Sequence, residues 1–205
     1  MKIYTMKNFL FLLSVLLVTV SFGQTAEEYF NQAEAKYNLK DYKGAIVDYT
    51  KAIQLNPTNV DAYYNRGFTK YNLDDYNGAI EDYTKAIKLD PIFNSAYYTR
   101  GIAKANLEDY NGAIEDFNKA IELNSSDIDF YYQRGLVKGM LKEFSGAIED
   151  FNKAIELDPA YTKAYLSRGM TKYALLNNDD ACLDWSKAGE LGDSNAYVLI
   201  KEYCN

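Results

Sequence analysis

The sequence of 205 residues contains no histidine, and it has only 3 prolines, 2 cysteines and 1 tryptophan. Histidine is the commonest general base and a common metal ligand, so its absence removes the usual basis for acid–base or metal chemistry. Acidic pairs such as Glu81-Asp82 and Glu115-Asp116 remain. They recur in phase with the repeat described below, whereas a unique catalytic site should interrupt it. We therefore expect no enzymatic activity, no cofactor and no metal site.

Long hydrophobic runs are also scarce. The longest uncharged, largely apolar run, Phe9 to Val20, has 12 residues, whereas a membrane-spanning helix needs roughly 20. Two lysines precede this run, and the small residues Ser21 and Gly23 follow it. That order is typical of a secretory signal peptide. We predict a signal peptide at residues 1–23 and no integral membrane span in the mature chain.

Basic residues are fewer than acidic ones. The chain has 22 Lys and Arg and 29 Asp and Glu, which gives a formal net charge of −7. Loss of Lys2 and Lys7 with the signal peptide would change this charge to −9. Nucleic-acid binding requires a basic stripe that displaces counterions from phosphates, and none of the predicted helices carries one. We expect no nucleic-acid partner; a protein or peptide of basic character is favoured electrostatically.

What the sequence does contain is a repeat. The tripeptide Gly-Ala-Ile recurs at a spacing of 34 residues, beginning at Gly44, Gly78, Gly112 and Gly146. This period fits one helix–turn–helix unit, which must stack on its neighbours to bury its apolar face. We predict an all-α fold, an α-solenoid of stacked antiparallel helix pairs. Its units are residues 26–59, 60–93, 94–127, 128–161 and a degenerate fifth at 162–195, with a C-terminal capping helix at 196–205.

Small and large residues keep the same phase. Glycine recurs on the first helix of four units, and a large aromatic recurs on the second helix, at Tyr49, Tyr83, Phe117, Phe151 and Trp185. Small residues opposite large ones allow a repeated interface to pack densely. At these positions, over residues 26–195, the sequence resembles the tetratricopeptide-repeat (TPR) family. With the predicted signal peptide, the resemblance implies a TPR superhelix of a secreted bacterial type.

The resemblance also implies a binding surface. In this family the first helices line a concave groove that captures peptides or partner helices, which implies a non-enzymatic interaction scaffold here. The corresponding positions are mostly aromatic or aliphatic: Phe30, Tyr64, Phe68, Tyr71, Tyr98, Ile102, Tyr132, Leu136, Met170 and Tyr173. Tyrosine suits recognition because it offers a large contact area and a hydroxyl group. Alternatively, several of these residues only pack against their neighbours.

Other functions stay open at this stage. The chain could be a structural subunit of an envelope complex or a self-assembling module, so its oligomeric state is not fixed. A weaker alternative is that the aromatic groove binds glycans or other small ligands. The end of the signal segment, Phe22-Gly23-Gln24, together with the frequent Asn, Lys, Ile and Tyr residues, resembles secreted proteins of Bacteroidetes-type bacteria, which are Gram-negative. We therefore expect the periplasm or cell envelope of such a bacterium.

Two charged series repeat with the 34-residue step. Pairing each aspartate with the arginine of the next unit predicts structural ion pairs Asp48–Arg66, Asp82–Arg100, Asp116–Arg134 and Asp150–Arg168. This register is favoured because Gln32 replaces arginine in the first unit, where no aspartate precedes it. Such contacts would fix the angle between units. The alternative is that both series are solvated copies inherited by duplication.

The two cysteines lie near the C-terminus. Cys182 is near the start of the last second helix, and Cys204 follows the capping helix, with the turn Gly192-Asp193-Ser194 midway between them. Antiparallel helices joined at that turn would bring the thiols to the same height, so we predict a disulfide, which a secreted setting permits. The alternative is a buried small hydrophobic residue at Cys182 and an incidental Cys204.

Overall fold

A computed structural model of the chain describes residues 24–204. The predicted signal peptide, residues 1–23, lies outside the described residues. Within the described range the chain forms eleven helices and no strand. The helices are α2 (Ala26–Asn38), α3 (Tyr42–Leu55), α4 (Val60–Tyr71), α5 (Tyr76–Leu89), α6 (Asn94–Asn106), α7 (Tyr110–Leu123), α8 (Ile128–Met140), α9 (Phe144–Leu157), α10 (Thr162–Ala174), α11 (Asn178–Glu190) and α12 (Ser194–Tyr203).

Aspartate caps explain where three of the second helices begin. Asp75 precedes α5, and its side chain accepts a hydrogen bond from the backbone N–H of Gly78 at 3.0 Å. The same cap forms before α3 and α7. It satisfies a backbone donor that the helix itself leaves unpaired. The equivalent residues before α9 and α11 are Glu143 and Asn177, and neither side chain caps its helix.

In units two to five the two helices of a unit approach closely at a glycine, and Ala33 occupies that position in the first unit. A Cβ atom added to Gly101 would lie 2.8 Å from Cε1 of Phe117, and one added to Gly135 would lie 2.7 Å from Cε1 of Phe151. Both distances are too short for non-bonded carbon atoms, so the absence of a side chain is what admits the aromatic ring. The rings are fully buried as a result. The repeating glycine and aromatic positions therefore build the core of each unit.

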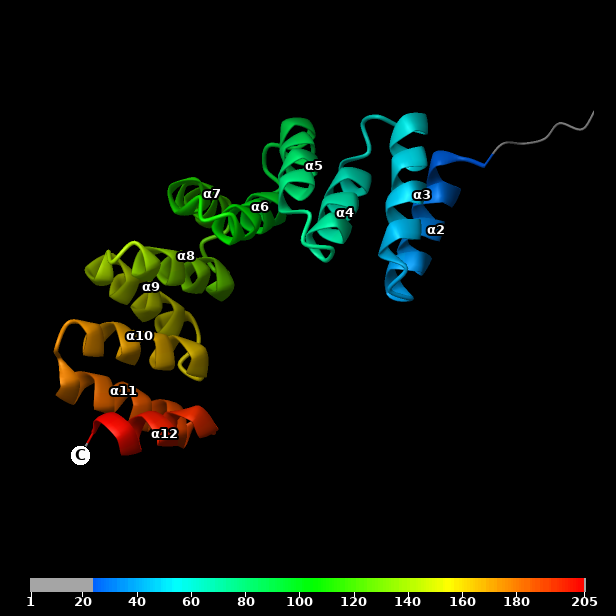
Figure 1. Cartoon of the computed structure of the whole chain (residues 1–205). Coiled ribbons are helices and arrows are strands. Elements are labelled where there is room, and N and C mark those ends of the chain that lie inside the picture. Colours follow the sequence, from blue (N-terminus) through cyan, green and yellow to red (C-terminus); the bar gives the residue numbers. More distant parts are fainter. Residues whose placement is uncertain (1–23, 205) are drawn as a thin grey trace, which may run out of the picture.

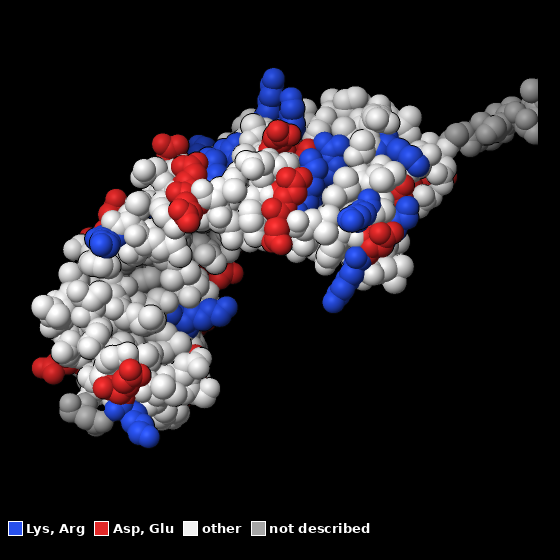
Figure 2. Space-filling view, in the orientation of Figure 1, with Lys and Arg blue, Asp and Glu red and all other residues white. Residues whose placement is uncertain are grey.

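The helix pairs follow one another along an arc that runs from α2 and α3 to α11 and α12 (Figure 1). Direct contacts also join the first helices of adjacent units, α4 to α6, α6 to α8 and α8 to α10. Among the described helices, no contact of similar extent joins α5 to α7 or α7 to α9. The first helices are therefore closer together and line the inner side of the arc, which the space-filling view shows as a broad hollow (Figure 2).

A buried ion network lies inside each unit. Asp116 is 4% exposed, and its carboxylate accepts hydrogen bonds from Nε and Nη2 of Arg100 at 2.9 and 2.7 Å. Nζ of Lys104 lies 2.8 Å from the same carboxylate. The arrangement recurs around three other aspartates, in the pairs Arg66–Asp82, Arg134–Asp150 and Arg168–Asp184. Bidentate arginine contacts with a second cation compensate the buried negative charge.

The predicted register of these pairs, from Asp48–Arg66 to Asp150–Arg168, is therefore wrong. Each arginine pairs with the aspartate of its own unit, 16 residues later, because the two helices of one unit pack antiparallel. Asp48 is not left alone, since Lys36 Nζ lies 2.5 Å from its carboxylate. The arginine still reaches the preceding unit, because Nη1 of Arg100 donates to Oγ1 of Thr84 at 3.0 Å.

Helix α12 covers the end of the array. It packs against α11, with Ala196 fully buried between them. The Tyr203 ring lies 4.9 Å from that of Tyr173 and 5.9 Å from that of Trp185, measured between ring centroids. The helix begins at Ser194, where the Asp193 side chain accepts a hydrogen bond from the backbone N–H of Asn195.

Candidate functional site

The inner side of the arc, formed by α2, α4, α6, α8 and α10, is called the groove below. It has one pocket at each junction between successive first helices. The pockets measure about 400 Å³ between α2 and α4, about 60 Å³ between α4 and α6, about 170 Å³ between α6 and α8, and about 300 Å³ between α8 and α10. The first two pockets form its N-terminal half, and the last two form its C-terminal half.

Tyrosines line the N-terminal half. Nδ2 of Asn72 donates to the hydroxyl of Tyr37 at 3.0 Å, and Nδ2 of Asn106 donates to the hydroxyl of Tyr71 at 3.2 Å. Each bond joins one first helix to the next. The Tyr37 ring also lies 6.0 Å from that of Phe68, between centroids. This half is therefore cross-linked by hydrogen bonds and partly filled by aromatic rings.

Hydroxyl groups also line the floor of the N-terminal half. Tyr49 and Tyr83 come from the second helices and are 2% and 0% exposed. Burial raises the pKa of both hydroxyls above the usual value, and the Glu34 carboxylate raises the pKa of Tyr49 further. Among residues 24–204 the Tyr83 hydroxyl has no hydrogen-bond partner of good geometry. The matching floor residues further along are Phe117 and Phe151, which carry no hydroxyl.

The C-terminal half is open and apolar. Ala105 and Gly139 occupy the positions of Tyr37 and Tyr71, and a Cβ atom added to Gly139 would meet no atom within 4 Å. Nearby, Met140 and Met170 are 61% and 58% exposed. The last pocket is lined by Gly135, Leu136, Gly139, Met140, Phe144, Phe151, Ser167, Met170, Thr171 and Ala174. This half therefore presents an exposed apolar surface with room beside it.

All the predicted groove residues lie on first helices, but they divide into two groups. Phe30, Tyr64, Tyr98 and Tyr132 are half-buried and pack on the second-helix aromatics of their own units, with ring centroids 5.6 to 6.0 Å apart. Ile102, Leu136 and Tyr71 are also half-buried, whereas Phe68, Met170 and Tyr173 are more than a third exposed. The first group therefore has a packing role whatever the groove binds.

Three groove features were not predicted from the sequence. They are the asparagine side chains that donate to tyrosines, the exposed Met140 beside Gly139, and the pocket around Glu34. The asparagines did leave a signal, because Asn38, Asn72 and Asn106 recur with the 34-residue step. The pocket left none, since it depends on the distance between α2 and α4.

Outside the groove lies a larger cavity of about 540 Å³ among α3, α4 and α5. It is lined by Ile53, Tyr63, Arg66, Ile80, Glu81, Asp82, Thr84 and Lys85. Arg66 and Asp82 belong to the ion network, and Arg66 Nη1 donates to Thr50 of the preceding unit at 3.0 Å. Two of its four charged side chains, Arg66 and Asp82, are thus already used in packing within and between units, which makes the cavity a poorer candidate site than the groove.

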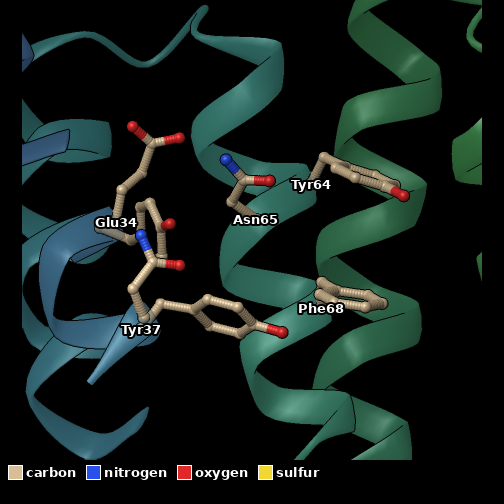
Figure 3. Close-up of a pocket in the computed structure, with 7 residues that line it drawn as sticks. Glu34, Tyr37, Tyr64, Asn65 and Phe68 are labelled. Carbon is tan, nitrogen blue, oxygen red and sulfur yellow. The ribbon is translucent and has the colours of Figure 1, made fainter. Parts of the chain in front are cut away.

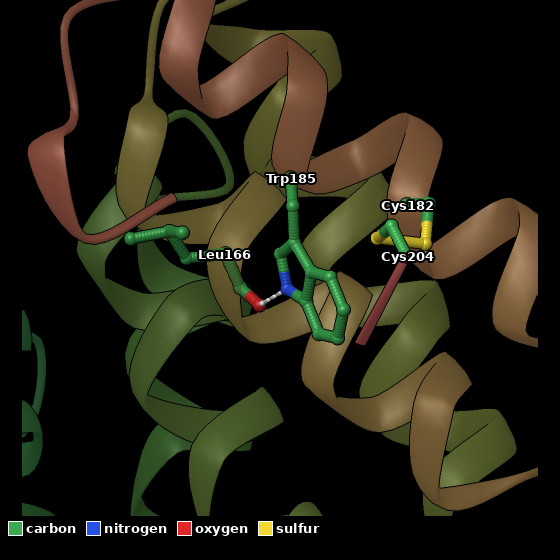
Figure 4. The surroundings of a disulfide bond; sticks show 4 residues. All are labelled: Leu166, Cys182, Trp185 and Cys204. Atoms are coloured by element: carbon green, nitrogen blue, oxygen red, sulfur yellow. Dashed lines mark hydrogen bonds between the residues drawn. A yellow bond between two sulfur atoms is a disulfide. The ribbon is translucent and has the colours of Figure 1, made fainter. Parts of the chain in front are cut away.

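A disulfide joins the two cysteines at the end of the array. Cys182 of α11 and Cys204, which follows α12, have an S–S distance of 2.03 Å and a Cα–Cα distance of 5.8 Å (Figure 4). Beside them Trp185 is buried, and its Nε1 donates to the carbonyl oxygen of Leu166 at 3.4 Å. The bond holds the capping helix on the last repeat.

Two further features, a metal-binding cluster and a membrane-spanning helix, are both absent from residues 24–204. Between residues 24 and 204, no three His, Cys, Asp or Glu side chains gather in a way that could hold a metal ion. None of the helices described is both long enough and apolar enough to cross a membrane.

Comparison with known families and structures gives consistent matches. A TPR repeat profile matches residues 33–74 and 104–142, and a tetratricopeptide repeat profile matches residues 60–93 and 128–161. A search of curated proteins finds no significant match. A crystal structure of MamA has 32% sequence identity and a TM-score of 0.76, and the alignment covers 80% of this chain and 96% of that one.

Two further solved structures share the fold at lower identity. YrrB, described as a TPR protein with an unusual peptide-binding site, has 24% identity and a TM-score of 0.75, with 86% of this chain and 92% of that one covered. PilF of Pseudomonas aeruginosa has 20% identity and a TM-score of 0.73, with 85% and 80% covered. The profile matches, the MamA similarity and the stacked helix pairs show that this chain belongs to the tetratricopeptide-repeat family.

Proposed function

We propose that this chain is a protein-interaction scaffold whose groove binds a peptide or a segment of a partner protein. The tetratricopeptide repeat is in general a non-enzymatic, protein-interacting fold. The observation that carries the proposal is the open C-terminal half of the groove, where Met140 and Met170 are more than half exposed. Exposed apolar patches of this kind mark interaction sites in soluble proteins, and methionine adapts to varied partners.

The two halves of the groove suit different parts of a bound segment. Phe68 and Tyr71 offer aromatic edges in the N-terminal half, while Leu136 and the methionines offer flexible aliphatic contact in the other half. Four pockets along one continuous inner surface are typical of a site that holds consecutive side chains. The peptide-binding site of YrrB, a structure of the same fold, is consistent with this use.

Partner capture by the immobilised mature chain tests the proposal. Met140→Glu with Met170→Glu places two charges in the groove, whereas Val47→Glu with Leu55→Glu places them on α3, where those side chains are 52% and 56% exposed. The groove variant should lose the partners that wild type retains, and the α3 variant should keep them. Loss in the α3 variant alone would assign binding to the outer helices instead.

We also propose that the chain works after secretion, in the periplasm or cell envelope of a Gram-negative bacterium. The Cys182–Cys204 disulfide supports this proposal because such bonds persist in oxidising compartments. The order of residues in positions 1–23 supports it as well. Fractionation of the native host, with intact mass measured before and after reduction, tests it. A cytoplasmic chain with both thiols reduced would contradict it.

A second candidate function, assembly through the C-terminal end, is favoured by the surface of the last two helices. Leu183 on α11 and Tyr197 and Val198 on α12 are 68%, 62% and 61% exposed. A terminal repeat that exposes apolar side chains can stack on another body. Light scattering should then give a mass above that of one chain, and Val198→Asp should restore the single-chain mass. A single-chain mass for wild type at high concentration would reject this candidate.

A further inference from the structure

The first pocket of the groove has two facing walls from neighbouring first helices. Glu34 and Tyr37 come from α2, and Tyr64, Asn65 and Phe68 come from α4 on the opposite side (Figure 3). Asn38 and the buried Tyr49 complete a lining that encloses about 400 Å³. No lysine or arginine lines this pocket. It is thus a polar and aromatic pocket whose one charged group is the Glu34 carboxylate.

Glu34 differs from the residues at the same position in every later unit. Those residues are apolar: Phe68, Ile102, Leu136 and Met170. The Glu34 side chain is exposed, and its carboxylate makes no hydrogen bond or ion pair with any residue in the range 24–204. Covering an unpaired carboxylate with an apolar ligand costs desolvation free energy. A ligand that brings a cation to the carboxylate compensates this cost with a charge-assisted hydrogen bond.

Nearby lysines do not neutralise this carboxylate. Lys36 is the nearest lysine on the same helix, and its Nζ lies 2.5 Å from the carboxylate of Asp48. Lys51 also points to Asp48, with Nζ at 3.9 Å. Both cations belong to the buried network of the first unit. The negative charge of Glu34 is therefore available to a ligand. Its electrostatic effect reaches Tyr49 at the floor of the pocket, where it contributes to the raised pKa of that hydroxyl.

The rest of the lining suits a cation carried on an aliphatic chain. The rings of Tyr37 and Phe68, 6.0 Å apart between centroids, offer aromatic faces to a cation and to its methylene groups. The side-chain carbonyl groups of Asn38 and Asn65 can accept hydrogen bonds from an ammonium or guanidinium group. An acidic side chain or a C-terminal carboxylate would instead meet the like charge of Glu34.

We propose that this pocket receives a lysine or arginine side chain of the segment bound in the groove. This inference rests on the proposed function, because it names the chemistry of one position of the bound segment. Charge complementarity with Glu34 selects a basic side chain, and the aromatic walls hold its aliphatic stem. The excess of acidic residues over the whole chain, with a formal net charge of −7, favours the same class of partner.

A positional-scanning library of extended decapeptides tests the inference with the mature chain. Wild type should enrich lysine or arginine at one fixed position of the retained peptides. Glu34→Gln should reduce that enrichment about tenfold, as expected for loss of one charge-assisted contact with a cation. Glu122→Gln is the matched control, since it removes the same charge from the outer helix α7, where the Glu122 side chain is 68% exposed. It should leave the enrichment unchanged.

The outcomes distinguish failure of the pocket inference from failure of peptide binding in the groove. Retention of peptides by wild type with no basic preference, or with a preference that Glu34→Gln preserves, would overturn the inference and leave groove binding standing. Retention of no peptide at all would overturn groove binding of peptides together with the inference. Glu34→Lys gives a further check, because it should replace the basic preference with an acidic one.

Discussion

The two halves of the groove have the same framework but different linings. In the N-terminal half Tyr37 and Tyr71 line the pockets between first helices and accept hydrogen bonds from asparagines. In the C-terminal half the same positions hold Ala105 and Gly139, and methionine side chains lie exposed beside the open space. The floor changes as well, from tyrosine to phenylalanine.

The residues that stay constant across this change are those that hold the helices together. Arg66–Asp82 in the N-terminal half and Arg134–Asp150 in the C-terminal half have nearly the same geometry, with Nη2–Oδ1 distances of 2.6 and 2.5 Å. The inner side chains differ between the halves, whereas these ion pairs do not. Under the proposed function, the difference between the halves assigns recognition to the repeat positions whose side chain changes from unit to unit.

The largest expected effect comes from removing a buried aspartate. Asp82→Ala and Asp150→Ala each leave an arginine and a lysine without their shared carboxylate, which should lower the free energy of unfolding by about 3 kcal/mol. Urea denaturation measures it, with the exposed neighbours Glu81→Ala and Glu149→Ala as controls. Unequal losses in the two halves would show that the framework differs as well as the lining.

Rebuilding the tyrosine of the N-terminal half in the C-terminal half should reduce binding. Gly139→Tyr places a ring in the open space beside Met140, and we expect about tenfold weaker retention of library peptides, equivalent to about 1.4 kcal/mol. Gly139→Ala is the control, because it raises helix propensity by up to about 1 kcal/mol without filling the space. Equal retention by both variants would mean that the open space is not used.

Replacing Tyr83, a floor residue of the groove, should change how the stability of the fold depends on pH in the alkaline range. The Tyr83 pKa is raised by burial, so above about pH 10 the unfolded chain loses this proton while the folded chain keeps it, and stability falls as pH rises. Tyr83→Phe, the residue type of Phe117 and Phe151, should make that fall less steep. The same substitution should also raise the free energy of unfolding at pH 7 by about 1 kcal/mol, because it removes a buried hydroxyl that has no hydrogen-bond partner.

Those two effects are measured by urea denaturation at pH 7 and again above pH 10. Tyr197→Phe is the control for the alkaline series, because this tyrosine is 62% exposed, whereas Tyr83 is fully buried. An unchanged alkaline slope in Tyr83→Phe would contradict the role assigned to the buried hydroxyl.

The smallest expected effect concerns helix caps. Glu143→Asp should create at α9 the cap that Asp109 gives α7, raising the free energy of unfolding by about 0.5–1 kcal/mol. The reverse change, Asp109→Glu, should lower it by a similar amount. Thermal melting of both variants checks the pair, and changes of the same sign would refute the capping explanation.

Much of the fold could be predicted because the period alone requires stacked helix pairs. The pairing of charges could not, since separations of 16 residues within a unit and 18 between units recur with the same period. Gln32 favoured the wrong choice because the first unit uses Lys36 instead of an arginine. The series Lys70, Lys104, Lys138 and Lys172, one turn after the arginines, could have indicated the network.

The groove was only partly predictable for a similar reason. Resemblance placed its residues on first helices, but a pattern of aromatic residues does not distinguish a ring that packs inward from one that faces a partner. Tyr64 and Phe68 are four residues apart on α4, yet Tyr64 packs on Tyr83 and Phe93 while Phe68 is 37% exposed. Pocket volumes depend on distances between helices, which the sequence does not state.

Site-specific photo-crosslinking tests the central claim, that the groove is the binding surface, most directly. A photoreactive phenylalanine analogue at Met170 in the groove is compared with one at Val47 on the outer helix α3, since their exposed fractions of 58% and 52% are similar. With the decapeptide library as probe, the account predicts cross-links at residue 170 and none above background at residue 47. Equal cross-linking, or cross-linking at residue 47 alone, would contradict it.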